Sequence, residues 1–179
     1  SDLYSLSAAP TDNLLRITVK DLGDHSRDLI NLRPGTRVFM EGPYGAFTKN
    51  RATRKHVLLV GGGVGITPIR AIAEEFGDTV NMELIYRVSD ESELVLKDEL
   101  DYLADRSGGA LKVHYMIGSR HQHPINVKTM QRIVPALADS DIYVCGPTGL
   151  VDSVVKAAIG AGVPKNRIHH EEFEFHSKA

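Results

Sequence analysis

The sequence lacks several features that would place it in a specialised class of protein. It has a single cysteine, Cys145, in 179 residues, which excludes an intramolecular disulfide framework and a cysteine-ligated iron–sulfur cluster. Its formal net charge is only -2, so no overall basic field predicts binding to nucleic acid. No apolar run approaches the roughly 20 residues that cross a bilayer, and the first residues do not resemble a signal peptide. We therefore expect a cytoplasmic protein in a reducing compartment.

The first part of the chain, residues 1–50, has the alternating apolar pattern of half-buried β-strands. We expect strands over 3–10, 14–23 and 36–45, and a short helix within 25–35. A polar and basic stretch follows, and the predicted domain boundary lies there, at residue 50.

The second part, residues 51–179, alternates short apolar runs with amphipathic segments of about 10–15 residues, which is typical of a parallel sheet covered by helices. Right-handed crossovers make such a sheet doubly wound, so the predicted fold class is α/β. The expected strands are 56–63, 81–88, 111–119, 141–147 and 168–175. The expected helices are 68–77, 92–109, 126–138 (with Asn126 as its cap) and 148–162.

A glycine cluster lies between the first strand and the first helix of this second part, in the stretch LLVGGGVGITPIR from Leu58 to Arg70. Glycines allow positive φ and close approach of the backbone to a phosphate, and the helix that follows offers free N–H groups. Ligands of such sheets bind at the carboxyl ends of the strands. Pro68 is tolerated at the start of a helix. The cluster indicates a dinucleotide-binding turn; the alternative is a plain tight turn.

The ends of the next two strands bear on which dinucleotide would bind. The second strand would usually end in an acid that holds a ribose hydroxyl, but here Arg87 stands near its end, and the third strand ends in Gly118-Ser119-Arg120. An arginine and a serine hydroxyl suit a 2′-phosphate. Either arginine alone is also an ordinary solvated charge. Together they favour NADP(H) over NAD(H).

Three further features have both a functional and a plain structural interpretation. Cys145 ends an apolar strand, where a small buried hydrophobe is common. Phe173 and Phe175 alternate in the last strand, as in simple packing onto a core. The histidines near residues 120 and 170 have no partners at metal-ligand spacing, so we expect no metal site.

Seven short motifs, taken together, resemble the ferredoxin–NADP⁺ reductase superfamily. They are LYSLS at 3–7, GDHS at 23–26, GPYG at 42–45, GGGVGITP at 61–68, GSR at 118–120, CGPTG at 145–149 and EEFEF at 171–175. Their form is most similar to the reductase portion of ferric-reductase or NADPH-oxidase-like proteins. The resemblance implies a FAD-binding β-barrel followed by an NAD(P)-binding α/β domain, with residues 1–50 as the C-terminal half of the barrel.

The resemblance also implies a role for each matched residue. Tyr4 would stack on the flavin ring and Ser5 would hydrogen-bond near its reactive nitrogen, while Gly23 and Ser26 would lie at the flavin pyrophosphate. Ser119 and Arg120 would meet the 2′-phosphate. The residues that would hold the dinucleotide are Gly61, Gly63, Gly65, Thr67 and Pro68. Those beside the nicotinamide are Cys145, Gly146 and Pro147, and those at the flavin's other face are Phe173 or Phe175, with Glu171 or Glu172 for proton transfer.

The chain departs from the family pattern at two places. Asp2 stands where the family has a cation, and about three barrel strands that precede Tyr4 in the family are absent. The expected function is hydride transfer from NADPH to FAD, with electrons passed to a separate haem domain, ferric iron or iron–sulfur protein. A membrane domain would precede residue 1 in a ferric-reductase-like parent. The alternative is a flavin-free nucleotide-binding module for docking or regulation. A third interpretation, a nicotinamide-dependent dehydrogenase without flavin, is disfavoured because the sequence shows no substrate domain.

Overall fold

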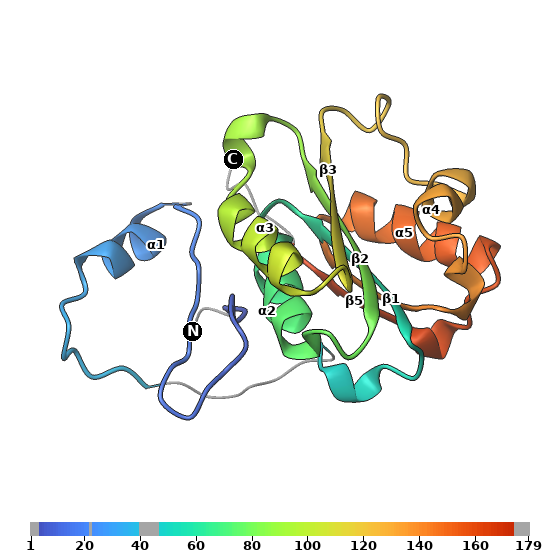
Figure 1. Cartoon of the computed structure of the whole chain (residues 1–179). Helices are drawn as coiled ribbons and strands as arrows, with labels where there is room; N and C mark the ends of the chain where they lie inside the picture. The colour runs from blue at the N-terminus through green and yellow to red at the C-terminus, as the bar shows by residue number, and fades with distance from the viewer. Residues whose placement is uncertain (1–3, 22, 40–46, 174–179) are drawn as a thin grey trace.

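The computed structural model of the chain describes residues 4–21, 23–39 and 47–173. Its main body is a five-stranded, fully parallel sheet with the strand order β3-β2-β1-β4-β5. Helices lie on both faces of the sheet (Figure 1), which confirms the predicted α/β class. The strands are β1 (His56–Gly62), β2 (Asn81–Val88), β3 (Leu111–Ile117), β4 (Asp141–Gly146) and β5 (Ile168–Glu172).

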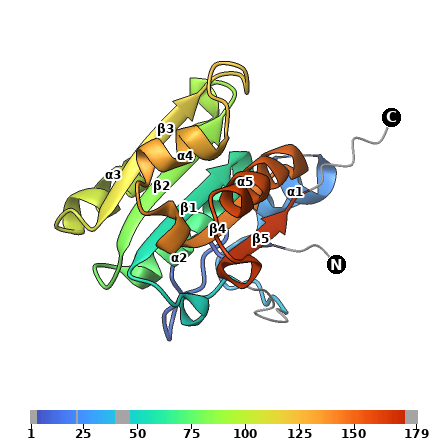
Figure 2. The ribbon, with the colours of Figure 1, turned by 90° about the vertical axis from the view of Figure 1, so that its right-hand side faces the viewer.

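Two helices cover each face of the sheet. The helices α2 (Ile66–Phe76) and α3 (Lys97–Arg106) pack on one face. On the other face lie α4 (Val127–Ile133) and α5 (Thr148–Gly160), which Figure 2 shows in front of the strands. Because successive side chains of a strand point to opposite faces, β1 supplies both cores and therefore reads as a continuous apolar run.

The order of the strands places a switch point at the centre of the sheet. The chain runs from β1 outward through β2 to β3, then crosses back to β4 on the other side of β1 and continues to β5. The carboxyl ends of β1 and β4 are therefore neighbours from which the connections leave in opposite directions. In open α/β sheets, ligands bind in the crevice at such a point.

Several helix boundaries differ from the sequence-based expectation. The helix α2 begins at Ile66 and includes Pro68 in its first turn, because proline is unfavourable only deeper in a helix. The helix α4 ends at Ile133, so its predicted extension past Pro135 is wrong; the residue before a proline is driven out of the helical region. The cap is confirmed, because the Asn126 side chain accepts a hydrogen bond from the Thr129 N–H at 2.9 Å.

The helix α3 is shorter than expected because the predicted helix over 92–109 is interrupted near its start. The 3-10 helix η4 (Glu91–Glu93) takes the first part, and Leu96, with φ 61°, precedes α3 as its N-cap. A left-handed leucine is unfavourable, and helical periodicity does not reveal it.

The first part of the chain forms far less sheet than the sequence predicts. In residues 4–21 and 23–39 the helix α1 (Asp24–Asp28) and the 3-10 helix η1 (Leu29–Asn31) are present. The strands expected over 3–10 and 14–23 are reduced to two isolated antiparallel bridges, Leu6–Ile17 and Thr11–Leu14. The described start of the third, residues 36–39, is not a strand. These strand predictions are wrong in the described residues.

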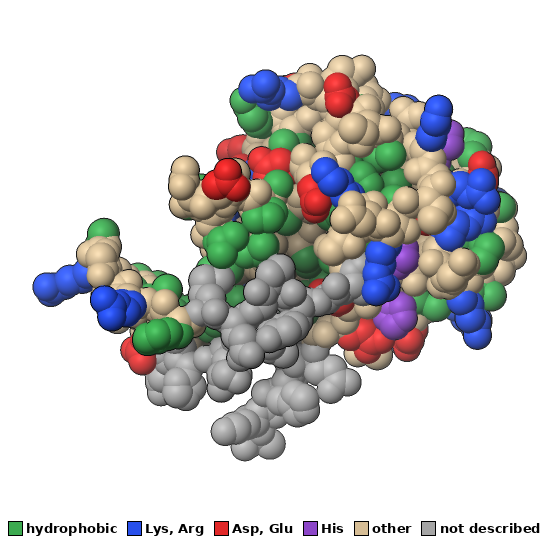
Figure 3. All heavy atoms as spheres, turned by 90° about the horizontal axis from the view of Figure 1, so that it is seen from below, with side chains coloured by type: hydrophobic (Ala, Val, Ile, Leu, Met, Phe, Trp, Pro, Cys, Tyr) green, Lys and Arg blue, Asp and Glu red, His purple; other side chains and the backbone are tan. Residues whose placement is uncertain are grey.

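Large apolar side chains are exposed along this first part. Phe39 is 93% exposed, and Figure 3 shows hydrophobic and basic side chains on the part that projects from the body. The exposed apolar residues here are Tyr4, Leu14, Leu15, Ile17, Ile30, Leu32, Val38 and Phe39. Asp2, the GPYG motif at 42–45 and Phe175 lie outside the described residues.

Candidate functional site at the carboxyl edge of the sheet

The carboxyl ends of the five strands meet at one edge of the sheet because the strands are parallel. Most of the residues predicted to bind a dinucleotide lie along this edge. The paired neighbours there are Arg87 with Gly62, Gly61 with Cys145, and Gly146 with Glu172. The register thus brings residues from both halves of the α/β part into one row.

At the switch point, the glycine turn touches the backbone of the segment that follows β4. A Cβ atom on Gly65 would lie 2.1 Å from the Cys145 carbonyl oxygen, and one on Gly146 would lie 3.1 Å from the Gly62 Cα. A Cβ atom on Gly62 would lie 2.4 Å from Leu150 Cδ2. Because real Cβ atoms do not approach a backbone carbonyl so closely, Gly65 requires glycine for this contact between segments about 80 residues apart. The contact at Gly146 is tight, and at Gly62 the near atom is the movable end of a leucine side chain.

The turn itself is a short 3-10 helix, η3 (Gly63–Gly65), between β1 and α2. Gly63 has φ 54°, and a Cβ there would meet none of the described atoms within 4 Å, so the tip of the turn is open. The Thr67 hydroxyl donates to the Val64 carbonyl oxygen at 3.0 Å, and both Thr67 and Pro68 are buried. These two residues therefore shape the turn from inside.

The predicted nicotinamide side lies at the ends of β4 and β5. The side chain of Cys145 is fully buried in the core under α2, and burial, with a smaller contribution from Glu171, raises the pKa of its thiol. The thiol therefore stays protonated at neutral pH. Pro147 and Glu172 are exposed, and Phe173 packs against the same core, with its N–H donating to the Gly146 carbonyl oxygen at 3.1 Å.

The predicted 2′-phosphate residues lie in the loop that follows β3. Ser119 and Arg120 are exposed, and the Ser119 N–H donates to Gln122 Oε1 at 2.8 Å. A Cβ atom on Gly118 would lie 2.6 Å from the same oxygen, so Gly118 leaves room for this clamp. The guanidinium of Arg87 donates to the His123 carbonyl oxygen and thus ties the loop to β2.

Two residues of this edge were not identified from the sequence. Gln122 closes the loop after β3, and its position three residues after Ser119 is the one signal that could have indicated it. Leu150 packs over Gly62 from the first turn of α5, and nothing in its local sequence distinguishes it from an ordinary core residue.

Four of the predicted flavin residues lie in the first part of the chain. Tyr4 is 42% exposed and Ser5 is half-buried. Gly23 has φ 134° and precedes α1, and the Ser26 hydroxyl donates to the Gly23 carbonyl oxygen at 2.9 Å. Both pairs lie outside the two bridges of this part, and their proposed roles stay predictions.

The other features of the described residues that bear on function are a hollow beside α3, the placement of metal-ligating side chains and the character of the helices. A hollow of about 570 Å³ lies between η4 and the start of α3, but Glu91, Asp98 and Glu99 on its wall make it unfavourable for a phosphate. Among the described residues, no group of three His, Cys, Asp or Glu side chains is placed to hold a metal ion. None of the helices within the described ranges combines the length and apolar character needed to span a membrane.

Comparison with known proteins gives consistent matches. Residues 59–156 match the family model described as "Oxidoreductase NAD-binding domain". Flavohemoprotein B of Dictyostelium discoideum is 30% identical, over 95% of this chain and 44% of that protein. NADH-cytochrome b5 reductase 1 of Candida glabrata is 29% identical, over 80% of this chain and 54% of that protein. The chain thus spans about half the length of these relatives.

A solved structure is similar over nearly the whole chain. It is the flavohem-like FAD/NAD-binding domain of nitric oxide dioxygenase from Vibrio cholerae O1 biovar El Tor, with a TM-score of 0.69 and 26% identity, covering 95% of this chain and 76% of that one. With the glycine turn at the switch point and a family model that covers more than half of the sequence, this chain belongs to the oxidoreductase NAD-binding domain family, within the ferredoxin–NADP⁺ reductase superfamily.

Proposed function

We propose that this chain binds NADPH at the carboxyl edge of its sheet and holds the nicotinamide for hydride transfer to FAD. The observation that carries this proposal is the contact between the glycine turn and the Cys145–Pro147 segment across the switch point. Gly65 allows the turn to pack against the Cys145 carbonyl, and Gly63 leaves the tip of the turn open, where the backbone can approach a bound dinucleotide. The N-terminus of α2 adds the positive end of a helix dipole, which favours the pyrophosphate.

We propose NADP(H) rather than NAD(H) as the preferred dinucleotide. Ser119 and Arg120 are exposed side by side at the end of β3, where a hydroxyl and a guanidinium can both bind a 2′-phosphate. β2 ends in Arg87-Val88, and the nearest carboxylate beyond it, Asp90, accepts hydrogen bonds from the Ser92 N–H and hydroxyl. In this proposal Arg87 does not contact the 2′-phosphate itself. Its guanidinium holds the loop that carries Ser119 and Arg120, by donating to the His123 carbonyl oxygen.

Cys145 is proposed to act through its backbone and its position. Its thiol is buried and protonated in the core, and its backbone lies beside Gly61 and Gly65 of the glycine turn. Hydride transfer chiefly requires that the two rings be stacked and aligned, so the proposed task of Cys145, Gly146 and Pro147 is to shape the nicotinamide side. Glu172, exposed at the end of β5, is proposed for proton transfer with solvent.

FAD is proposed as the hydride acceptor because of the relatives and the first part of the chain. A flavohemoprotein and a domain described as FAD/NAD-binding are among the matches. When bound, FAD would take up the hydride and release electrons one at a time. Tyr4 and Ser5 are the residues proposed to face the flavin, with Gly23 and Ser26 near its pyrophosphate and Phe173 or Phe175 on its other face.

A separate electron acceptor completes the proposal. The names of the relatives mention haem and cytochrome b5, so a haem protein or haem domain is the proposed acceptor, ahead of ferric iron or an iron–sulfur protein. This acceptor would be either another domain of the same parent protein or a separate partner protein, and it could lie in a membrane or outside one.

A second candidate function is a nucleotide-binding module without flavin. The observation that favours it is the scarcity of β-sheet pairing in the described residues of the first part. Isolated bridges stand there in place of the expected strands, and large apolar side chains are exposed. Such a chain would bind the dinucleotide, carry out no hydride transfer alone, and act in docking or regulation.

The absorbance spectrum of the purified chain separates these functions. A yellow protein that NADPH bleaches without oxygen is the result expected for the reductase. A colourless protein whose melting temperature rises with NADP⁺ indicates the module, since a ligand at about 100 times its Kd stabilises by about 2.7 kcal/mol. A protein that is neither bleached by NADPH nor stabilised by NADP⁺ contradicts both candidate functions.

A further inference from the structure

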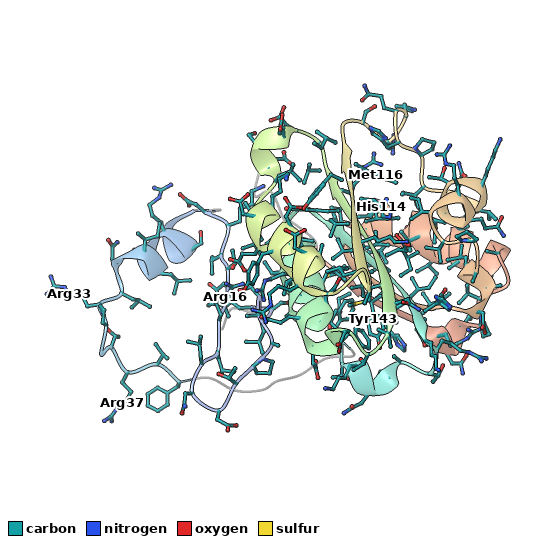
Figure 4. The ribbon with its side chains drawn as sticks, viewed as in Figure 1. Arg16, Arg33, Arg37, His114, Met116 and Tyr143 are labelled. Carbon is teal, nitrogen blue, oxygen red and sulfur yellow. The ribbon has the colours of Figure 1, made fainter. Side chains whose placement is uncertain are left out.

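Four charged side chains join the first part of the chain to the helices on one face of the sheet. They are Arg16, Arg70, Glu74 and Glu99, and we call them the junction network. Figure 4 shows Arg16 between the first part and α2 and α3. Arg70 Nη1 lies 2.5 Å from Glu74 Oε2, and Arg70 Nε lies 2.8 Å from Glu99 Oε2. The second contact is an ion pair by distance, because the Nε–H has no hydrogen-bond partner among the described residues. Arg16 Nη2 lies 2.7 Å from the same Glu99 oxygen. Glu99 thus binds one arginine from each part.

The junction network also holds backbone groups of the first part. Arg16 Nη2 donates to the Ser7 carbonyl oxygen at 2.7 Å, and Arg16 Nε donates to Ser7 Oγ at 3.1 Å. The Ala9 N–H donates to Glu74 Oε2 at 2.8 Å. Ser7 is fully buried. The two carboxylates on α2 and α3 therefore hold residues 7–9 against the helices, directly and through Arg16.

Burial distinguishes Arg70 from ordinary surface ion pairs, whereas the side chains of Arg16, Glu74 and Glu99 are each about one-third exposed. Exposed pairs contribute little, but the Arg70 side chain is only 8% exposed and a buried arginine without its carboxylates would be strongly unfavourable. The hydrogen bond from Arg16 lowers the pKa of Glu99. Burial acts to raise the pKa of Glu74, but the bonds from Arg70 and Ala9 outweigh it, and the pKa is lowered. Both carboxylates are therefore ionised at neutral pH.

The place of Arg70 in α2 links the junction network to the candidate site. The helix α2 begins directly after the glycine turn, and Arg70 lies in its second turn. Ser7 is two residues from Ser5 and three from Tyr4. One helix therefore carries the glycine turn at its start and, about one turn later, the anchor of the segment proposed to face the flavin.

We propose that Arg70, Glu74, Glu99 and Arg16 are positioning residues that set the distance between the Tyr4–Ser5 segment and the glycine turn. The anchoring is a property of this chain with or without cofactors. Its purpose rests on the proposed function, because hydride transfer is highly sensitive to small misplacements of the two rings. Two measurements test these statements separately.

The anchoring is tested by amide hydrogen exchange of the full chain, with no nucleotide or flavin added. In Glu99→Gln, the amides of Ser7 and Ala9 should exchange about tenfold faster or more, because Arg16, which holds Ser7, loses its charged partner and residues 7–9 then open together. Asp101→Asn is the matched control: it changes a carboxylate on the same helix that pairs with Lys97 instead. There the exchange of Ser7 and Ala9 should stay as in the unchanged chain.

The exchange of β1 and β4 amides shows whether a variant has lost its whole fold. If Glu99→Gln accelerates these as well, Arg16→Gln provides the second test, because Arg16 lies in the first part and leaves the buried Arg70–Glu74 pair in place. Faster exchange at Ser7 and Ala9 with unchanged β1 and β4 supports the anchoring. Unchanged exchange at Ser7 and Ala9 in both variants overturns it.

The positioning role is tested by kinetics in protein reconstituted with flavin. Glu99→Gln should lower kcat for flavin reduction by roughly tenfold at an unchanged KM for NADPH, because the dinucleotide site is intact and only alignment changes. Asp101→Asn should change neither constant. Equal kcat in all three proteins overturns positioning even where the exchange result confirms anchoring. If neither the unchanged protein nor any variant reduces flavin, the proposed function is wrong. The hydrogen-exchange result still decides whether the junction network anchors the first part.

Discussion

At the scale of single residues, two glycines of the turn have different tasks at the switch point. Gly65 is required by its contact with the backbone of Cys145, and Gly63 leaves the tip of the turn open. The sequence predicts a glycine turn from local spacing, but it does not reveal that Gly65 packs against the Cys145 carbonyl. That contact depends on β4 lying beside β1, which only the winding of the sheet determines.

Gly65→Ala should lower the free energy of unfolding by about 1–3 kcal/mol, because the added methyl group overlaps a backbone carbonyl that has no free rotation. It should also weaken NADP⁺ binding. Gly149→Ala is the matched control: its Cβ would meet no described atom within 4 Å, and the residue lies in α5, where alanine is favoured by about 1 kcal/mol. Urea unfolding and titration calorimetry measure both effects. Equal stability of the two variants would contradict the tight contact.

His169 makes stability depend on pH. Its side chain is 6% exposed and its Nε2 has no hydrogen-bond partner among the described residues. Burial lowers the pKa of His169, although Asp141 acts in the opposite direction. The folded state therefore keeps the ring neutral, while the unfolded state binds a proton below its ordinary pKa of about 6.5. The free energy of unfolding should fall as the pH is lowered through that value.

The measurement is urea unfolding between pH 7.5 and 5.5 for three proteins. The loss of stability attributable to one such group is at most about 1.4 kcal/mol per pH unit. His169→Phe keeps an aromatic ring against Tyr143 and should flatten the dependence. His170→Phe changes an exposed neighbour and should leave it unchanged. A slope that persists in His169→Phe would show that another group is responsible.

At the scale of elements, the helices and strands of the α/β part follow from the sequence, and their exact ends often do not. Continuous apolar runs predict β1 and β4, because strands covered on both faces need apolar residues at every position. Leu96 breaks the expected helix through its left-handed backbone, which periodicity does not detect. The first part was predicted less well: alternation indicates a strand, but a strand forms only where a partner is present to pair with it.

The loop after β3 is the element that should select the dinucleotide. Arg120→Ala should weaken binding of NADP⁺ about tenfold or more and leave NAD⁺ binding unchanged, since a hydrogen bond to a charged group contributes about 1.5–3 kcal/mol. Arg132→Ala, at the exposed end of α4, is the control and should change neither affinity. Calorimetry with both dinucleotides measures the difference, and an equal loss for NAD⁺ and NADP⁺ would argue against a 2′-phosphate site.

At the scale of the whole molecule, a well-packed parallel sheet is attached to a first part that has little packing of its own. The junction network connects the two parts through α2 and α3. The sequence motifs identified the family and most residues of the carboxyl edge. They did not identify the junction network, because Arg16, Arg70, Glu74 and Glu99 are distant in the sequence and each resembles an ordinary surface charge.

The most direct test of the account is an NMR titration of the ¹⁵N-labelled chain with NADP⁺. We predict that the amide signals of the glycine turn at 61–65, of Cys145–Gly149 and of Ser119–Arg120 shift together and saturate at one dinucleotide per chain. Signals at the opposite edge of the sheet should stay in place. An absence of shifts at millimolar NADP⁺, or shifts confined to another surface, would contradict a dinucleotide site at the switch point.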